Sequence, residues 1–299
     1  MRIAVIGAGR MGAIRVEDLA ADPRVQEVLV ANRTEARAAE LAERFGVRSL
    51  PWSALEDVDV DGTVVALSTA AHGDQLTRVL SRGRPVLCEK PIALTLGDTE
   101  SAIALAEQQG ATLQIGFQRR FDTGIRAVRD HIAGGGMGIL YALRLLSHDH
   151  SPSTPEFLAG SGGIFRDLHV HDLDLVRWLT GEQIATVFAT SAVRAHPQYA
   201  EFDDADVSLI HAVTTSGVQV SVHGARHDAL GHDVRLEALG SADSVATGLS
   251  HRTPLRSLDE DLGTNAAPYV GFIDRFRDAF RRETAAFVSL VTGEGPNPC

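Results

Sequence analysis

Three short stretches of the chain carry side chains whose types and spacing could support chemistry. The first is the pattern G-x-G-x-x-G formed by Gly7, Gly9 and Gly12. The second is a Glu-Lys-Pro sequence around Lys90, which is the only lysine of the chain. The third, residues 167–172, reads Asp-Leu-His-Val-His-Asp. Together they could bind a phosphate-bearing cofactor, polarise an oxygen and move a proton.

The glycine pattern follows a short apolar run and precedes a helical pattern, which is the setting of a dinucleotide-binding turn. Gly7 would allow the tight turn, Gly9 the close approach of backbone to a pyrophosphate, and Gly12 the packing of helix against strand. Arg10 and Met11 complete the loop. Free amides at the helix N-terminus favour phosphate charge. The pattern predicts dinucleotide binding, and the alternative is an ordinary glycine turn.

The end of the second predicted strand should contact the adenosine ribose. NAD-specific sites place Asp or Glu there to accept hydrogen bonds from the 2′-hydroxyl. This chain has Asn32, Arg33 and Thr34, with Arg37 one turn later and no carboxylate before Glu35. Because these groups can donate to a 2′-phosphate, the sequence predicts NADP(H) in preference to NAD(H). The alternative is that Arg33 lies over the adenine of NAD.

Lys90 follows a predicted strand, and ligands of doubly wound sheets bind at the carboxyl ends of strands. Lysine is a compact donor that can approach a small hydroxyl, whereas arginine brings a wide planar fork. Because the other 27 of the 28 lysine and arginine residues are arginine, Lys90 is a candidate catalytic residue. The alternative is that this single lysine is present by chance. Ser68, Thr69, His72 and Glu89 are expected at the same rim as cofactor contacts. For His72, a structural role at a helix start is equally open.

Asp167 and His171 are four residues apart on a predicted helix over 164–179, so they should share a face. A carboxylate that orients an imidazole is the usual arrangement of a general base. Two alternatives are a structural histidine and a metal site that also uses His169. On a helix His169 and His171 point about 200° apart and do not converge, so we expect no metal.

Over residues 1–119 apolar strands alternate with helical patterns, which predicts a parallel, doubly wound sheet. From about residue 185 short alternating strands follow one another, which predicts an antiparallel sheet. We place the domain boundary near 119/120. Strands are expected over 2–6, 25–31, 62–68, 85–88, 113–117, 139–148, 185–193, 207–214, 218–223 and 234–239. Helices are expected over about 10–21, 34–45, 74–81, 96–109, 124–132, 164–179 and 272–291.

The composition sets limits on partners and location. The 299 residues carry a formal net charge of −11, which argues against nucleic acid and anionic membranes as partners. The two cysteines, Cys88 and Cys299, do not form a disulfide framework. No apolar run approaches the roughly 20 residues of a membrane span, and no signal peptide is recognisable. These observations predict a cytoplasmic enzyme.

The chain resembles the Gfo/Idh/MocA oxidoreductases, and within them the inositol dehydrogenases. The segments that carry the resemblance are spaced over nearly the whole chain. They read G-A-G-R-M-G at 7–12, S-T-A-A-H at 68–72, C-E-K-P at 88–91, G-F-Q-R-R-F-D at 116–122 and G-G-I-F-R-D-L-H-V-H-D-L-D at 162–174.

The resemblance implies an α/β protein with a Rossmann domain over 1–119 and a substrate-binding and oligomerisation domain over 120–299. The second domain would contain a large, open-faced, mostly antiparallel sheet, covered by another subunit in a homodimer or homotetramer. Relatives usually run one helix further, back onto the Rossmann domain, and this return helix is expected to be absent here. The acidic residue of NAD-type members is replaced by Asn32.

The resemblance also implies an activity, which is NAD(P)-dependent oxidation of a secondary alcohol on a cyclic polyol or sugar. The family's catalytic lysine falls on Lys90, and its Asp-x-x-x-His pair falls on Asp167 and His171. Arg120 and His150 fall where inositol-type members contact substrate hydroxyls. Two alternatives are a reductase of a linear or modified sugar and a non-catalytic sensor of cofactor or sugar.

Overall fold

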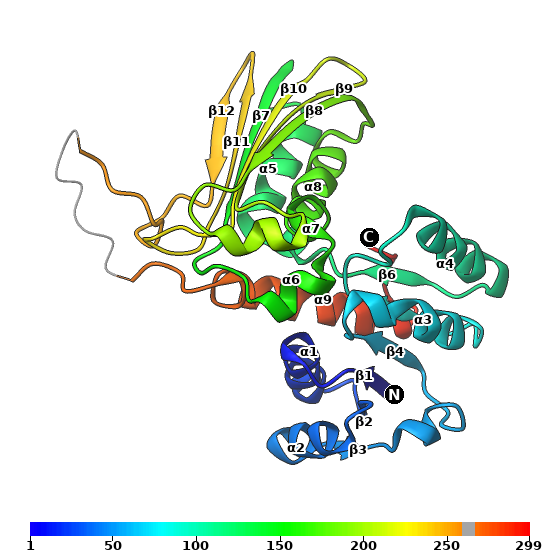
Figure 1. The fold of residues 1–299 in the computed structure, drawn as a ribbon. Helices are drawn as coiled ribbons and strands as arrows, with labels where there is room; N and C mark the ends of the chain where they lie inside the picture. Colours follow the sequence, from blue (N-terminus) through cyan, green and yellow to red (C-terminus); the bar gives the residue numbers. More distant parts are fainter. Residues whose placement is uncertain (259–266) are drawn as a thin grey trace. The chain divides into compact units, whose positions relative to one another are not determined.

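The computed structural model describes residues 1–258 and 267–299. The chain divides into two units, of which the first comprises Met1–Gln118 and Phe280–Cys299 and the second Arg119–Ala279 (Figure 1). The expectation that all of residues 120–299 belong to the second domain is therefore wrong for the last twenty. The physical reason is that Phe287 and Val288 are buried in the core of the first unit.

The first unit contains a six-stranded parallel sheet with the strand order β3-β2-β1-β4-β5-β6. This order is that of a doubly wound dinucleotide-binding sheet, so the predicted fold class is confirmed. β1 lies centrally, between β2 and β4, and its apolar residues are buried because helices cover both faces. The strands are β1 (Arg2–Ile6), β2 (Glu27–Ala31), β3 (Arg48–Ser49), β4 (Gly62–Val65), β5 (Val86–Cys88) and β6 (Leu113–Ile115).

The helices of this unit begin and end near the predicted positions. Gly46 and Gly110 close α2 and α4 in the left-handed conformation, and the Thr95 hydroxyl accepts a hydrogen bond from the Asp98 amide at the start of α4. The helices are α1 (Arg10–Ala21), α2 (Glu35–Phe45), α3 (His72–Leu80) and α4 (Leu96–Gln109), with short 3-10 turns η1 (Trp52–Leu55) and η2 (Thr69–Ala71). The turn η3 (Gln118–Phe121) begins at Gln118, and its other residues belong to the second unit.

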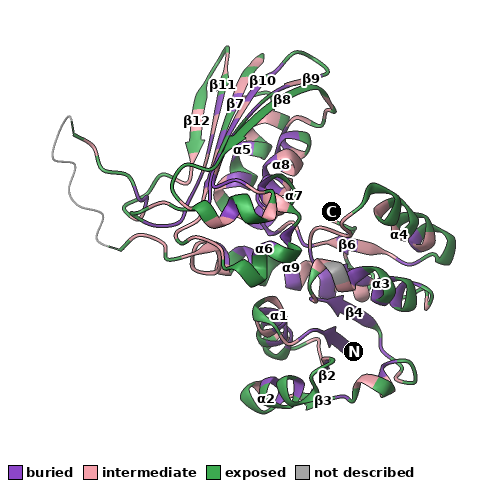
Figure 2. Cartoon of the chain, in the orientation of Figure 1, coloured by how far each residue is buried: buried purple, intermediate pink, exposed green. Residues whose placement is uncertain are grey.

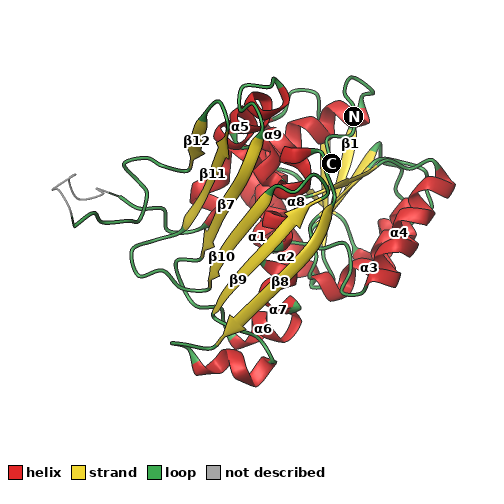
Figure 3. Ribbon diagram, turned by 90° about the horizontal axis from the view of Figure 1, so that it is seen from above, coloured by secondary structure: helices red, strands yellow, loops and turns green. Residues whose placement is uncertain are grey.

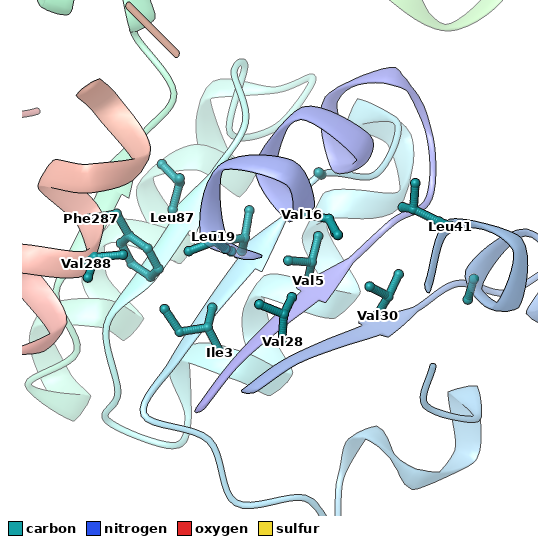
Figure 4. Close-up of a cluster of buried hydrophobic side chains, with 13 residues drawn as sticks. Ile3, Val5, Val16, Leu19, Val28, Val30, Leu41, Leu87, Phe287 and Val288 are labelled. Atoms are coloured by element: carbon teal, nitrogen blue, oxygen red, sulfur yellow. The ribbon is translucent and has the colours of Figure 1, made fainter. Parts of the chain in front are cut away.

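Helix α9 (Phe272–Val291) contributes its second half to the first unit. Phe287 and Val288 pack against the core formed by β1, β2 and α1 (Figure 4). A Cβ atom added at Gly62 on β4 would lie 2.8 Å from a methyl group of Val291. The glycine therefore permits the close packing of this helix on the sheet.

The second unit contains a six-stranded sheet with the order β12-β11-β7-β10-β9-β8. Four of its five strand pairs are antiparallel, and β7 pairs with β10 in parallel. The predicted mostly antiparallel sheet is confirmed, whereas β12 was not expected. The strands are β7 (Leu140–His148), β8 (Ile184–Ala192), β9 (Val207–Thr214), β10 (Gln219–Ala225), β11 (Asp233–Gly240) and β12 (Ser244–Thr247).

Helices cover one face of this sheet and leave the other open (Figure 3). Ser147 on β7 faces the helices, because its hydroxyl donates to Asp172 on α8. On the opposite face, Phe188 and Leu209 are 68% and 49% exposed, and Figure 2 shows β8 exposed along its length. The helices are α5 (Thr123–Ala133), α6 (Pro155–Ser161), α7 (Gly163–Asp167) and α8 (Val170–Thr180), with the turn η4 (Pro197–Phe202).

The single helix expected over 164–179 is two helices, α7 and α8, separated by Leu168 and His169. The His169 side chain turns inward at this break and is fully buried. Among the described residues, no helix is long and apolar enough to cross a membrane.

Candidate active site

The glycine loop between β1 and α1 has the geometry that dinucleotide binding requires. Gly7 has a φ of +118°, and a Cβ there would lie 2.3 Å from the Ala66 carbonyl oxygen. A Cβ on Gly12 would lie 1.9 Å from the carbonyl oxygen of Gly7. At Gly9 a Cβ would meet nothing within 4 Å, and no side chain caps the α1 N-terminus. The loop is therefore tight where it turns and open at Gly9, which fits a pyrophosphate.

Asn32, at the end of β2, is hydrogen-bonded within the loop region. Its Oδ1 accepts from the Ala8 amide at 3.2 Å, and its Nδ2 donates to the Thr34 carbonyl at 3.1 Å. The Arg33 guanidinium lies 5.7 Å from the ring centre of Trp52. Glu35 accepts a hydrogen bond from the Trp52 amide at 3.2 Å. The Glu35 carboxylate, which is the first one after Asn32 in the sequence, is thus bound to the backbone of η1.

Lys90 follows the end of β5 and is half-buried, and its peptide bond to Pro91 is cis. The preceding Glu89 points inward, where its carboxylate accepts a hydrogen bond of 2.9 Å from Nε of Arg15. Burial, reinforced by the charge of Glu89, raises the pKa of the Cys88 thiol well above its usual value. Glu89 is predicted from the sequence as a cofactor contact, and its contact with Arg15 is not.

His72, the first residue of α3, is 1% exposed. Its Nδ1 lies 3.0 Å from the Pro91 carbonyl oxygen, and its Nε2 lies 3.1 Å from the Leu67 carbonyl oxygen. The ring therefore connects the loop after β4 to the loop that carries Lys90. These contacts agree with a structural role for His72 at the start of a helix. Contact of His72, Ser68 or Thr69 with the cofactor stays a prediction.

In the second unit, Asp167 is the last residue of α7, and His171 lies in the first turn of α8. The two are therefore not on one continuous helix, so the spacing argument for their pairing does not hold. Asp167 accepts a hydrogen bond from Arg226, whose Nη1 donates to Oδ2 at 2.7 Å. His171 is buried at 7% exposure. The general-base assignment stays a prediction.

Arg226 follows β10, is 1% exposed, and lies among three carboxylates. Besides Asp167, its guanidinium lies 3.6 Å from Asp204 and 3.8 Å from Asp149. Burial opposes the charged guanidinium, but these carboxylates outweigh it and raise the pKa of Arg226. Arg226 is not predicted as a site residue from the sequence, because nothing in the local pattern distinguishes it from other arginines.

His169 and Asp172 belong to a buried hydrogen-bond network beneath α8. Asp172 accepts from Arg119 at 2.6 Å, from Ser147 at 2.7 Å and from His169 at 2.8 Å. Although burial raises the pKa of the Asp172 carboxyl, Arg119 and these hydrogen bonds outweigh it, and the pKa is lowered. The other ring nitrogen of His169 lies 2.6 Å from the Ser208 hydroxyl. Both ring nitrogens of His169 are thus bound by protein groups, so this histidine has a structural role.

The two predicted substrate contacts differ in their surroundings. Arg120 forms a two-point ion pair with Asp174, with 2.8 Å between Nε and Oδ2. His150 has a buried Nδ1 that meets no hydrogen-bond partner among the described residues. Arg120 therefore has a structural partner, whereas the His150 ring keeps a nitrogen for a ligand.

His232, at the start of β11, was not predicted as a site residue. It is 2% exposed, and both ring nitrogens lack a hydrogen-bond partner within the described parts of the chain. Its Nδ1 lies 3.7 Å from a carboxylate oxygen of Asp149. Burial, with the charges of Arg119 and Arg275, lowers the pKa of His232 to about 3. The ring is therefore neutral at pH 7, and one nitrogen can accept and the other donate.

Among the described residues, one group, His148, Asp228 and Asp233, offers metal-ligand atoms within 4.8 Å of one another. Protein partners already contact each member. The two ring nitrogens of His148 lie 3.0 Å from Asp228 and 2.8 Å from His223, and Arg235 contacts Asp233 at 3.0 Å. These contacts form an ion-pair network at the end of β7 and the start of β11.

Comparison with known proteins identifies the family. Residues 1–117 match the oxidoreductase family with an NAD-binding Rossmann fold, and residues 125–246 match the GFO/IDH/MocA C-terminal domain. The myo-inositol dehydrogenase Hyg17 of Streptomyces leeuwenhoekii is 35% identical over 100% of this chain and 90% of its own length. The myo-inositol 2-dehydrogenase of Thermotoga maritima is 30% identical, covering 99% of this chain and 90% of that protein.

Solved structures agree with this result. The crystal structure of a myo-inositol dehydrogenase from Corynebacterium glutamicum matches with a TM-score of 0.90 and 33% identity, covering 100% of this chain and 90% of that one. The glycine loop has the backbone geometry of a nicotinamide dinucleotide site, and the strand order is that of the Rossmann fold. The chain belongs to the Gfo/Idh/MocA family of nicotinamide-dependent oxidoreductases.

Proposed function

We propose that this protein oxidises a secondary alcohol of a neutral cyclic polyol of the inositol class, or reduces the corresponding ketone. Its relatives named above are inositol dehydrogenases matched over nearly the whole chain. The observation that carries the substrate class is the set of buried polar groups around Arg226 and His232. These groups combine carboxylates with imidazole nitrogens of His150 and His232 that meet no hydrogen-bond partner among residues 1–258 and 267–299.

The charge of this region favours an uncharged ligand. Three carboxylates, of Asp149, Asp167 and Asp204, surround the single guanidinium of Arg226 within 3.8 Å. A phosphorylated or acidic sugar would add like charge to this excess, which costs free energy in a buried site. Hydroxyl groups both donate and accept, so they can serve carboxylates and neutral imidazoles together. A polyol therefore matches the groups that the second unit provides.

The proposed mechanism gives each predicted catalytic residue one role. His171 takes the hydroxyl proton as the general base, and Asp167, held by Arg226, supports the imidazolium that forms. Lys90 donates a hydrogen bond to the substrate oxygen as negative charge grows there. The bound nicotinamide supplies the hydride acceptor. His150 and His232 bind the other hydroxyls.

The experiment that tests this proposal is an activity screen with purified protein. We expect turnover of myo-inositol or scyllo-inositol and little turnover of sugar phosphates or uronic acids. Preferred turnover of a linear or modified sugar would instead support the reductase alternative. Tight cofactor binding without turnover of any polyol or sugar would support the sensor alternative.

We also propose that the enzyme accepts NADP(H) at least as well as NAD(H). The support is the charge at the 2′ position, where Asn32 replaces a carboxylate and Glu35 is bound to the Trp52 amide. Arg33 rests against Trp52 and Arg37 lies in the first turn of α2, so two cations follow β2, and the carboxylate between them is the one that the Trp52 amide binds.

We further propose that the open face of the second sheet is covered by another copy of the chain. Phe188 and Leu209 are 68% and 49% exposed on this face. An exposed apolar sheet face of this kind is typical of an interface. Light scattering on the purified protein should give a dimer or tetramer, and Phe188→Asp should reduce that mass, whereas a monomeric wild type would refute the proposal.

A further inference from the structure

Arg15 lies on α1, one turn beyond the glycine loop, and its side chain is fully buried. Buried guanidinium groups are costly unless each donor is paired. Nε donates to Glu89 at 2.9 Å, and Nη1 donates to the Thr284 hydroxyl at 3.0 Å and the Phe280 carbonyl at 3.4 Å. Nη2 contacts both Glu89, at 2.7 Å, and Glu283. Every nitrogen of the Arg15 guanidinium therefore donates a hydrogen bond, and Nη2 also forms an ion pair with Glu89.

Glu89 is fixed by this network on one side and by backbone on the other. A Cβ on Gly116 would lie 2.7 Å from Oε2 of Glu89, so only glycine leaves room for the carboxylate. The Glu89 amide donates to the Val65 carbonyl at 3.0 Å, which continues the ladder between β4 and β5. The residue directly after Glu89 is Lys90, so the position of the Glu89 backbone sets where the lysine side chain begins.

We propose that Arg15 and Glu283 are positioning residues for Lys90 and act through the Glu89 carboxylate. The inference rests on the proposed function in assigning a catalytic role to Lys90. Glu283 fixes the Arg15 fork from α9, and Arg15 in turn fixes Glu89. Residues far apart in the sequence thus hold the loop after β5.

Arginine is required at this position for a geometric reason. Its planar fork serves Glu89, Glu283 and Thr284 together, whereas a lysine ammonium has three donors at one point. Arg15→Lys keeps the charge but cannot reach all these acceptors. Glu283→Gln keeps an acceptor oxygen of the same shape but removes the charge that doubles the strength of the contact. The two variants therefore loosen the network from opposite ends.

The single lysine permits a direct spectroscopic test. Reductive methylation of the purified protein with ¹³C-formaldehyde labels Lys90 and the Met1 α-amine, and no other amine of the sequence. In wild type we expect one sharp dimethyl-lysine resonance. In Glu283→Gln and Arg15→Lys we expect this resonance to shift and broaden, while the Met1 signal stays constant.

Arg24→Gln is the matched control. Arg24 also binds α9, through the Ser289 hydroxyl at 2.8 Å and the Ala285 carbonyl at 3.2 Å, but it does not contact Glu89. The control should lower the melting temperature without changing the Lys90 resonance. An unchanged Lys90 resonance in both network variants, or an equal change in Arg24→Gln, would refute the positioning role.

Kinetics then connect the positioning role to catalysis. In both network variants we expect kcat to fall by on the order of 10- to 100-fold, as misplacement of a reacting group does, while the cofactor Kd changes less than about twofold. If the Lys90 resonance changes in the network variants but the wild-type protein turns over no polyol, the positioning role stands and the proposed function is refuted. Loss of cofactor affinity in parallel with kcat would show a merely structural role.

Discussion

Nη1 of Arg226 donates a 2.7 Å hydrogen bond to the carboxylate of Asp167, and the arginine side chain is 1% exposed. Removing one partner of a buried ion pair leaves the other charge uncompensated. We therefore expect Arg226→Gln to lower the free energy of unfolding by about 3–5 kcal/mol and to reduce kcat. Chemical denaturation and steady-state kinetics measure the two effects.

The control for this variant is Arg78→Gln, which removes an exposed arginine from the first unit. Arg78 forms an ion pair with Glu56, and their side chains are 54% and 63% exposed. Such pairs contribute at most about 1 kcal/mol. Equal destabilisation by the two variants would contradict the importance of the buried pair.

Lys90→Arg should keep the positive charge and lose most of the activity. The compact ammonium can donate to a developing alkoxide, whereas a guanidinium fork does not fit the same space. Loss of one such donor costs on the order of 100- to 1,000-fold in kcat. The measurement is kcat together with the cofactor Kd, which should stay close to wild type. Near wild-type kcat would remove Lys90 from the mechanism.

His171→Ala and Asp167→Asn should each lower kcat, by on the order of 100- to 10,000-fold for loss of the general base. If the two act as a unit, the double variant should be about as slow as the slower single variant. Cofactor affinity should hardly change. Single effects that simply multiply in the double variant would show that the two residues act independently, although both would still contribute.

Much of the fold could be predicted because its signals are local. The apolar runs at β1, β4 and β5 and the closing glycines of α2 and α4 each depend on a few neighbouring residues. Helix α9 was expected over 272–291, which are its observed bounds. That its second half packs in the first unit depends on Phe287 and Val288 meeting β1, a contact between the chain ends that periodicity does not record.

The site could be predicted from the sequence only where a local backbone conformation requires particular residue types. The glycine loop is recognisable because Gly7 and Gly12 need glycine for steric reasons, while Gly9 leaves the loop open. Arg15 and Arg226 could not be foreseen, because their partners Glu283 and Asp167 are 268 and 59 residues away in the sequence. The break between α7 and α8 was missed because His169 leaves the helix to join a buried network with Asp172 and Ser208.

His232 should make stability depend on pH. Its pKa is lowered from 6.5 to about 3 in the folded protein, chiefly by burial. Between these values the unfolded chain binds a proton that the folded protein excludes, so stability is full above pH 6.5 and falls as the pH decreases. The slope from this group is at most about 1.4 kcal/mol per pH unit. Melting curves of His232→Phe should be flatter over this window than those of wild type, and equal slopes would contradict this pH dependence.

The preference for NADP over NAD, which differ at the 2′ position of the adenosine ribose, can be measured directly. A carboxylate at position 32 would repel a phosphate dianion, and Asn32 does not. Arg33 supplies an opposite charge, and the N-terminus of α2, which begins after Thr34, also favours an anion. A charge-assisted contact contributes roughly 1.5–3 kcal/mol, which is about 10- to 150-fold in affinity. We therefore expect kcat/KM with NADP to equal or exceed that with NAD.

Arg33→Ala separates the two roles open to this arginine. If Arg33 binds the 2′-phosphate, the variant should lose kcat/KM with NADP by about tenfold or more and keep that with NAD. If Arg33 instead stacks on adenine from its place beside Trp52, both cofactors should weaken equally. Arg44→Ala, which removes an arginine that rests on Phe45 at the other end of α2, should change neither value. A clear wild-type preference for NAD that Arg33→Ala leaves unaltered would show that Arg33 does not contact the 2′ group.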